Sequence, residues 1–236
     1  MALPKVNTPT YELTLPSTGQ RVAYRPYLVK EEKIIMLAAE SNDEKQMVRA
    51  VKDVIASCTS GDVDTNKITM FDLEYLFTQL RAKSVGESSD IKVKCSECEK
   101  SNDVTVNLAD ITVDVPESSN RGTVKKITED ISVLLRYPIV DTVIESSQGM
   151  SEVDTAFNLI ASCIDTIYQG DEAFDVSEAS KEEVIEFVES LSTQQFQDIY
   201  EFVDTMPSAS LDVQFKCTHC GHENDLTVKG LANFFS

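Results

Sequence analysis

The sequence predicts an α+β fold made of two similar helical halves, each ending in a β-hairpin that carries two cysteines. Three observations predict it. Stretches with apolar residues at three and four spacing are interspersed with short stretches of apolar and polar alternation, so both helix and strand are expected. The segment DIKVKCSECEKSNDVTV at 90–106 returns as DVQFKCTHCGHENDLTV at 212–228, and the copies agree at eight of seventeen places. The tetrapeptide IASC precedes each copy.

The first half, residues 1–115, is predicted to combine a hairpin, helices and the first cysteine element. Alternating residues flank a Pro-Ser-Thr-Gly turn, and the pattern then becomes helical. The expected elements are a hairpin over 11–27, two helices over 28–58 divided at 41–43, a helix opened by Thr69 and Asp72 that ends near Val85–Gly86, and strands on both sides of the cysteines.

The second half, residues 131–236, is predicted to repeat this order after a linker at 116–130. The linker is assigned from PESSNRG, a polar segment rich in turn-forming residues. The expected elements are a strand over 131–138, a helix opened by Ser151 and Asp154 that runs through Tyr168, helices opened by Ser180 with Glu183 and by Ser192 with Gln195, the second cysteine element, and a short helix at 230–235.

Two of the predicted helices carry an apolar stripe with helical spacing. We expect both stripes to pack into a core, and an exposed groove for a partner is the alternative. The positions are Leu73, Leu76, Phe77 and Leu80 in the first half and Phe196, Ile199, Tyr200 and Val203 in the second.

The composition is that of a folded protein without membrane spans. The chain has 236 residues, 42% hydrophobic and 26% charged. No apolar stretch approaches the roughly 20 residues of a transmembrane helix, and the amino terminus has no basic segment followed by an apolar one. We therefore expect no membrane partner and a cytoplasmic location. The net charge of −19 repels a phosphate backbone, so no nucleic acid partner is expected either.

Each cysteine element has the form strand, Cys-x-x-Cys, polar turn and strand, which is typical of a zinc knuckle. A structural zinc ion takes four ligands in a tetrahedron, so the two thiolates of one knuckle need two more. The second knuckle supplies them, since Cys95, Cys98, Cys217 and Cys220 complete a set of four. We therefore predict a shared zinc-ribbon-like unit around a structural Zn²⁺, formed within one chain or between two.

Two turns without metal, a disulfide and a redox motif are the alternatives. A thioredoxin-like site places Cys-x-x-Cys at the start of a helix, whereas a second strand follows here, and a cytoplasmic setting disfavours disulfides. His219 and His222 are alternative ligands, although each lies close to cysteines that are already able to bind. Cys58 and Cys163 lie on apolar helix faces and are predicted to be small buried side chains.

The residues do not predict an enzyme. There is no histidine outside the second knuckle, and no G-x-S-x-G, H-E-x-x-H or phosphate-binding glycine loop. A shell of four cysteines leaves no open position at which a metal activates water. An acid pair hidden among the forty carboxylates is the remaining enzymatic alternative.

Three segments go beyond such patterns: LPKVNTPTYELTLPSTG at 3–19, FDLEYLFTQLRAKSVGE at 71–87 and FVDTMPSASLDVQFKCTHCGHENDLTVKGLANFF at 202–235. They closely resemble a family of baseplate proteins from contractile-tailed, T-even-like bacteriophages, in order and over essentially the whole chain. The resemblance implies a non-enzymatic viral tail protein, a baseplate hub subunit or hub assembly chaperone. It also implies binding to other baseplate hub or tape-measure proteins, in the cytoplasm of the host bacterium during assembly or in the tail baseplate of the virion. It transfers no catalytic residues.

The alternative function is that of a zinc-ribbon protein that binds nucleic acid or has a regulatory role. Such a protein needs a basic face. The knuckles offer only Lys92, Lys94, Lys100 and Lys216 among acidic residues, so the assembly protein is the preferred prediction.

Overall fold

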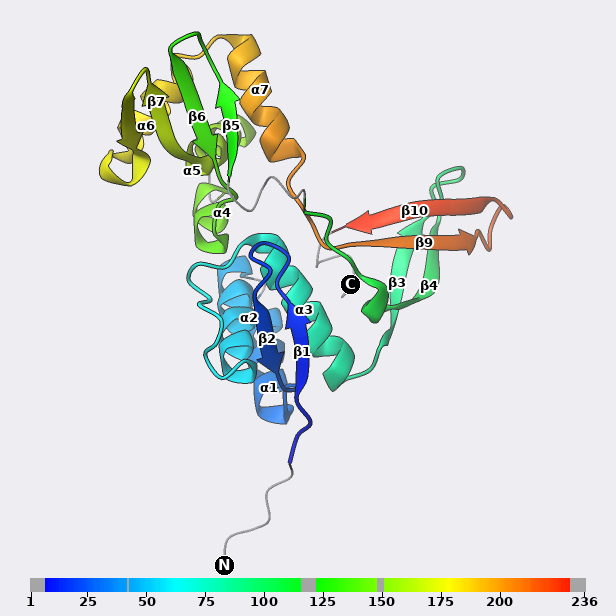
Figure 1. Ribbon diagram of the computed structural model, residues 1–236. Helices are drawn as coiled ribbons and strands as arrows, with labels where there is room; N and C mark the ends of the chain where they lie inside the picture. The colour runs from blue at the N-terminus through cyan, green and yellow to red at the C-terminus, as the bar shows by residue number, and fades with distance from the viewer. Residues whose placement is uncertain (1–6, 42, 116–121, 148–150, 230–236) are drawn as a thin grey trace, which may run out of the picture. The chain divides into compact units, whose positions relative to one another are not determined.

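The protein has an α+β fold, as predicted, in a computed structural model (Figure 1). The structure describes residues 7–41, 43–115, 122–147 and 151–229. It divides into two compact units, of which the first comprises Met1–Thr65, Phe71–Asp114 and Ser208–Ser236, and the second Asn66–Met70 and Val115–Pro207.

This division differs from the predicted halves at the carboxyl-terminal cysteine segment. That segment was assigned to the half at 131–236, but Ser208–Ser236 belongs to the first unit. The physical reason is that its strands share a hydrophobic cluster with the first cysteine hairpin, so the core crosses the predicted boundary.

The first unit consists of a hairpin with three helices and of two further hairpins. Its elements in chain order are β1 (Tyr11–Thr14), β2 (Arg21–Tyr24), α1 (Val29–Glu40), α2 (Glu44–Cys58), α3 (Met70–Ser84), β3 (Ser88–Lys94), β4 (Ser101–Asn107), η1 (Leu108–Asp110), β9 (Ser210–Lys216) and β10 (Glu223–Lys229).

The predicted amino-terminal hairpin is confirmed, with Tyr11 opposite Tyr24 in an antiparallel pair. Its turn is tied to α3, since the Ser17 amide N–H donates to Asp72 Oδ1 at 3.0 Å. Asp72 lies in the first turn of α3, where a carboxylate also faces the positive end of the helix dipole. The hairpin is thereby anchored on the helix that carries the first apolar stripe.

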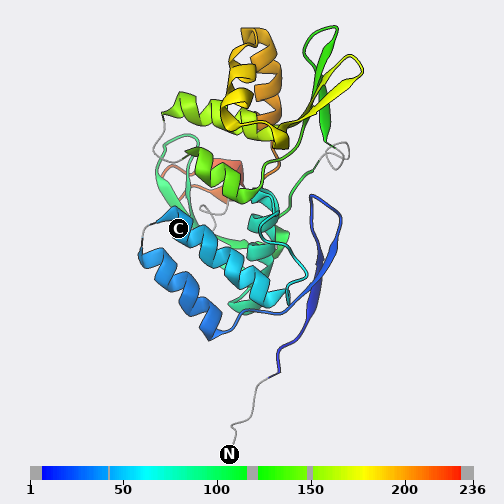
Figure 2. The ribbon, with the colours of Figure 1, turned by 90° about the vertical axis from the view of Figure 1, so that its left-hand side faces the viewer.

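The stripe on α3 packs into the core, as predicted. Leu73, Leu76, Phe77 and Leu80 are at most 5% exposed. The predicted division of the preceding helices is also confirmed: α1 ends at Glu40 and Asp43 caps α2 by accepting the Lys45 and Gln46 amide hydrogens. Figure 2 shows α1 and α2 side by side.

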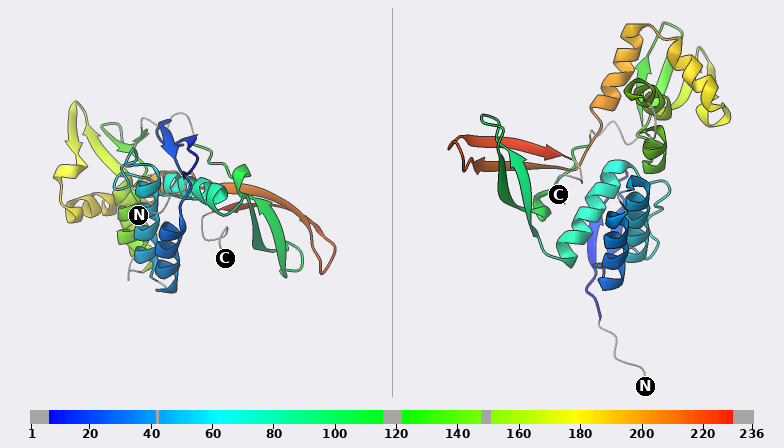
Figure 3. Two further views of the ribbon diagram at one scale, coloured as in Figure 1. Left: turned by 90° about the horizontal axis from the view of Figure 1, so that it is seen from below. Right: turned by 180° about the vertical axis from the view of Figure 1, so that it is seen from behind.

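The two cysteine hairpins come from distant parts of the sequence but pack together (Figures 1 and 3). β3 pairs with β4 and β9 with β10, each over seven residues in antiparallel register. Thr112 and Ser210 join the two segments through reciprocal backbone hydrogen bonds of 3.0 and 2.9 Å. Their shared cluster of buried residues comprises Ala82, Ile91, Val93, Val106, Leu108, Ile111, Ala209, Leu211 and Val213.

The second unit is a four-stranded antiparallel sheet in the order β5-β6-β7-β8, with helices α5, α6 and α7 on one face (Figure 2). Its elements are β5 (Thr123–Lys126), β6 (Ile131–Leu135), α4 (Val140–Ser147), α5 (Glu152–Cys163), β7 (Ile164–Gln169), β8 (Glu172–Asp175), η3 (Val176–Glu178), α6 (Lys181–Glu189) and α7 (Thr193–Asp204).

The helix caps of this unit are those predicted from the sequence, and its helices and sheet share one buried core. Ser180 and Ser192 form capping boxes at the starts of α6 and α7, and the Ser151 hydroxyl caps α5. Of the stripe on α7, Ile199 is fully buried, whereas Tyr200 is 36% exposed. The buried cluster comprises Val133, Leu135, Ile160, Ala161, Cys163, Ile164, Val184, Val188, Ile199 and Phe202.

Two details of the prediction are wrong here. The helix expected to run through Tyr168 ends at Cys163, and the chain continues directly as β7. Residues 164–167 include three β-branched side chains, which favour a strand. The predicted linker at 116–130 contains strand β5, which pairs with β6.

The short helix predicted at 230–235 lies outside the described residues.

Among the helices that the structure describes, none combines the length and the apolar character of a membrane span.

Candidate metal site

The predicted cysteines lie on two turns of the same construction. In the first turn the Cys95 N–H donates to the Lys100 carbonyl at 3.0 Å, and the Glu99 N–H donates to the Cys95 carbonyl at 3.0 Å. In the second turn the corresponding bonds run from Cys217 to His222 at 2.8 Å and from Gly221 to Cys217 at 3.0 Å. Each turn therefore places both of its cysteines on one side of a closed loop.

The structure brings the four predicted cysteines together. Cys95 Sγ lies 3.7 Å from Cys220 Sγ, and Cys98 Sγ lies 3.7 Å from Cys217 Sγ. All four sulfur atoms are within 4.8 Å of one another. Four sulfurs around zinc, with Zn–S bonds of about 2.3 Å, are about 3.8 Å apart at the tetrahedron's edges. The spacing and the donor type both fit a tetrahedral thiolate site.

Two asparagines, which the sequence analysis did not single out, brace the site across the hairpins. Asn102 of the first hairpin accepts the N–H and hydroxyl hydrogens of Thr218 on its Oδ1, both at 2.9 Å. Its Nδ2 group contacts Cys217 Sγ at 3.6 Å. Asn224 of the second hairpin does the same for Ser96 and for Cys95. Each hairpin thus supports the cysteine turn of the other.

These asparagines carried a signal in the sequence. Asn102 and Asn224 occupy matching positions of the two copies and are each 4% exposed. A buried amide needs hydrogen-bonding partners. The presence of the same asparagine in both copies of the repeat was therefore the sequence evidence that this residue has a structural role. Sequence spacing does not show that each amide bonds to the opposite copy.

Another matched pair explains further identities of the repeat. The Thr105 hydroxyl donates to Asp90 across the first hairpin at 2.6 Å, and the Thr227 hydroxyl donates to Asp212 across the second at 2.7 Å. Five of the eight repeated positions therefore have the same structural role in both hairpins: two cysteines, one buried asparagine and one cross-strand pair of aspartate and threonine.

The four cysteine thiols lie close enough together for each to affect the ionisation of the others. Burial opposes ionisation of Cys217, but backbone N–H groups of its own turn and the Asn102 amide lower the pKa of this thiol to about 5. A backbone N–H also lowers the pKa of Cys95. For Cys220, the His222 N–H favours the thiolate, yet burial and the other three sulfurs raise the pKa to about 12. Neighbouring thiolates repel one another, so each ionised sulfur makes ionisation of the others harder. A bound divalent cation would offset this repulsion.

The remaining candidate residues contribute no side-chain ligand atom to the cluster, although the His219 N–H donates to Cys217 Sγ at 3.4 Å. The His219 ring contacts the Ser101 carbonyl through Nε2 at 3.2 Å, and His222 supports the turn through its backbone. Cys58 and Cys163 are 2% and 1% exposed. Burial raises the pKa of Cys58 to about 11 and that of Cys163 to about 12, so both behave as inert buried thiols.

The site's geometry differs from that of a dithiol redox enzyme. All six cysteines are free, and each Cys-x-x-Cys joins two strands instead of opening a helix. Four sulfur donors around one metal ion would leave no vacant position for a substrate or water. The arrangement can hold a metal and crosslink the two hairpins.

Comparison with known proteins places the chain in a viral family. Residues 8–236 match the family described as T4 bacteriophage base plate protein. The baseplate hub assembly protein gp26 of Enterobacteria phage T4 is 27% identical over 208 residues, which cover 87% of this chain and 88% of that protein. No solved structure matches the chain at a significant level. Since the family match spans nearly the entire sequence, the chain belongs to the family of T4 bacteriophage base plate proteins.

Proposed function

We propose that this chain is a non-enzymatic protein that acts in assembly of the baseplate hub of a contractile-tailed phage, as a chaperone or as a structural subunit. The observation that carries the proposal is the similarity to a baseplate hub assembly protein along almost the full length of both chains. The partners are other baseplate hub or tape-measure proteins. The work takes place in the cytoplasm of the host bacterium, and a structural subunit would remain in the virion's tail baseplate.

The proposal includes a structural Zn²⁺ bound by Cys95, Cys98, Cys217 and Cys220. The sulfur spacing supports it, as does the cross-bracing of both turns by Asn102 and Asn224. In this proposal the two knuckles, which both belong to the first unit, form one zinc-ribbon-like unit.

The role of this site is mechanical. Four thiolates complete the tetrahedron, so the ion crosslinks two hairpins instead of activating a substrate. The crosslink closes the long chain segment between Cys98 and Cys217, which contains the whole sheet of the second unit. Closing a loop of this length restricts the unfolded chain and thereby favours the folded one.

The assembly role is tested by co-expressing the tagged chain with each hub and tape-measure protein of the same phage. We expect at least one of them to co-purify in stoichiometric amount and to be less soluble when the chain is omitted. Failure of every hub component to associate would refute the proposed function, whatever the metal content of the chain.

The metal is tested separately by native mass spectrometry of the purified chain. We expect one zinc ion per monomer, and a Cys98→Ser, Cys220→Ser variant that retains none. A zinc-dependent dimer with half the metal content would show instead that two chains share the ion. Because Cys58→Ser removes a thiol outside the site, it is the matched control and should keep its zinc.

A further inference from the structure

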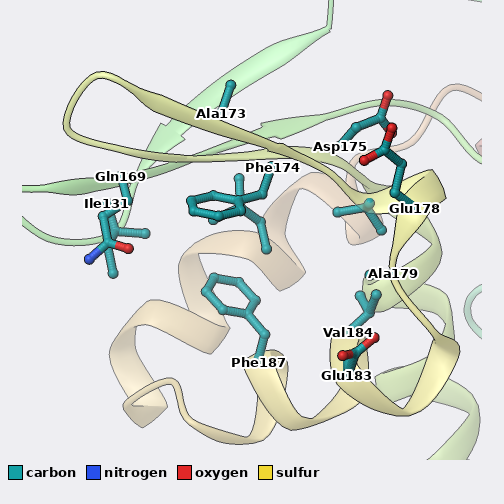
Figure 4. A pocket seen from close by; sticks show the side chains of 12 residues that line it. Ile131, Gln169, Ala173, Phe174, Asp175, Glu178, Ala179, Glu183, Val184 and Phe187 are labelled. Atoms are coloured by element: carbon teal, nitrogen blue, oxygen red, sulfur yellow. The ribbon is translucent and has the colours of Figure 1, made fainter.

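The second unit carries an open pocket of about 550 Å³ between its sheet and helix α6. Ile131, Ile167 and Phe174 line it from the sheet, and Val184 and Phe187 line it from the helix. Figure 4 shows the side chains of Phe174 and Phe187 pointing toward one another. The floor is therefore apolar, and its volume falls within the usual range of about 300 to 1,000 Å³ for ligand pockets.

The sheet side of this pocket is unusually exposed. Phe174 lies on β8, the last strand of the four-stranded sheet, and is 49% exposed. A large aromatic side chain left in water on an edge strand costs stability and invites association with another chain. Because this ring also lines the pocket, it offers a partly exposed apolar contact to a ligand there.

The charged groups that line the pocket are all acidic. Asp175, Glu178 and Glu183 are the carboxylates, and no lysine or arginine is among the lining residues. Figure 4 shows these three at one end, with Ile131 and Gln169 at the other.

Two of the carboxylates are also held in their charged form. The Ser177 hydroxyl and N–H lower the pKa of Asp175, and the charge of Arg136, which is not a lining residue, lowers it further. The Ser180 N–H and hydroxyl lower the pKa of Glu183. One end of the pocket therefore remains negative at neutral pH and below it.

We propose that this pocket binds a basic segment of a partner protein, which inserts one large apolar side chain between Phe174 and Phe187 and places lysine or arginine beside the acidic end. Charge complementarity selects the occupant, because opposite charges around an apolar contact speed association and exclude acidic competitors. Its identification as a protein segment rests on the proposed assembly function. The pocket lies entirely in the second unit, so the inference does not depend on the metal site.

The test begins with selection of random dodecapeptides, displayed on messenger RNA, against the zinc-loaded full chain. We expect enriched peptides to combine a phenylalanine, leucine or isoleucine with at least two neighbouring basic residues. Their affinity, measured by fluorescence polarisation, should fall as salt is added. Enrichment of peptides without basic residues, or no enrichment, would overturn the proposal.

Variants then locate the binding site. Phe174→Ala and Glu178→Lys should each weaken binding of the selected peptides at least tenfold. Both side chains are exposed, so the variants should fold, which a thermal melt by circular dichroism verifies. The matched controls are Val124→Ala on the opposite edge strand and Glu186→Lys on α6, which also change exposed residues outside the pocket.

The outcomes separate this inference from the assembly function. Equal binding by Phe174→Ala and the unmodified chain would refute the pocket even if hub proteins co-purify. Conversely, loss of peptide binding in Phe174→Ala and Glu178→Lys alone would support the pocket even if every co-purification failed.

Discussion

The buried amides of Asn102 and Asn224 connect the sequence repeat to the candidate metal site. Each lies in one hairpin and satisfies its hydrogen bonds on the turn of the other, with an Nδ2 to Sγ contact of 3.6 Å. Hydrogen bonds to ligand sulfurs orient them and stabilise their thiolate form. Such residues affect metal affinity without being ligands.

We therefore expect Asn102→Ala to lower zinc affinity by about 10- to 100-fold, the usual cost of losing a group that positions a ligand. Competition with a chromophoric chelator measures this affinity directly. Asn158→Ala removes a half-buried asparagine amide from α5, in the second unit, and is the control. Unchanged affinity of Asn102→Ala would show that the cross-hairpin bonds do not hold the ligands.

The residue after the second cysteine of each turn has a left-handed conformation. Its φ is 57° at Glu99 and 76° at Gly221. A side chain costs about 1 kcal/mol in this region, whereas glycine adopts it freely. The first turn therefore carries a strain that the second turn avoids.

Separate substitutions of these two residues should change the free energy of unfolding in opposite directions. Glu99→Gly is expected to raise the free energy of unfolding by as much as about 1 kcal/mol, and Gly221→Ala to lower it by about 1 kcal/mol. The nearest atom to a β-carbon at Gly221 is 3.9 Å away, so no collision adds to the second effect. Urea unfolding of the zinc-loaded chain measures both, and changes of the same sign would contradict the argument.

At the scale of elements, helix α1 depends on a buried acid. Glu31 is 2% exposed and pairs with Arg25 at 2.9 Å and with Lys30 at 3.2 Å. It also accepts the Leu28 N–H at 2.8 Å, at the start of the helix. Burial opposes ionisation of Glu31, but these hydrogen bonds outweigh it and lower its pKa below the ordinary 4.5.

This carboxylate should make the first unit sensitive to acid. Because the folded pKa lies below the unfolded one, its contribution is complete above about pH 4.5 and is lost as the pH falls through the folded pKa. Glu31→Gln should therefore destabilise the chain at pH 7, by about 2 kcal/mol, and much less at acid pH. Urea unfolding at several pH values checks this, with the exposed Glu40→Gln as the control. An equal loss at every pH would rule out the ionic role.

Local signals decided which elements the sequence could predict. The capping serines at 151, 180 and 192 mark helix starts correctly because a cap depends on neighbouring residues. Strand β5 and the switch from α5 to β7 were missed because both need β6 as a partner. The cysteine cluster was predicted from the repeat. The hydrogen bonds of Asn102 and Asn224 to the turn of the opposite hairpin were not, because they depend on how the two hairpins pack together.

At the scale of the whole molecule, the chain leaves the first unit after Asp114 and returns at Ser208. The returning strands β9 and β10 pair with each other in the described sheets, and they join the first unit through the shared apolar cluster, the Thr112–Ser210 backbone hydrogen bonds and the cysteine turns. An isolated hairpin is marginally stable in water. A metal crosslink at the turns would therefore add a stabilising connection that the hairpins do not have by themselves.

Zinc removal should consequently unfold the paired hairpins while the second unit stays folded, since that unit has its own sheet and buried cluster. Hydrogen exchange before and after chelation measures this. We expect protection to be lost in β3, β4, β9 and β10 and retained in β6, β7, α5 and α7. A Cys98→Ser, Cys220→Ser variant should reproduce the chelated pattern without chelator, which controls for removal of other ions. Loss of protection in both units at once would mean that they fold as one cooperative body, and unchanged protection in the hairpins would mean that the apolar cluster alone holds them.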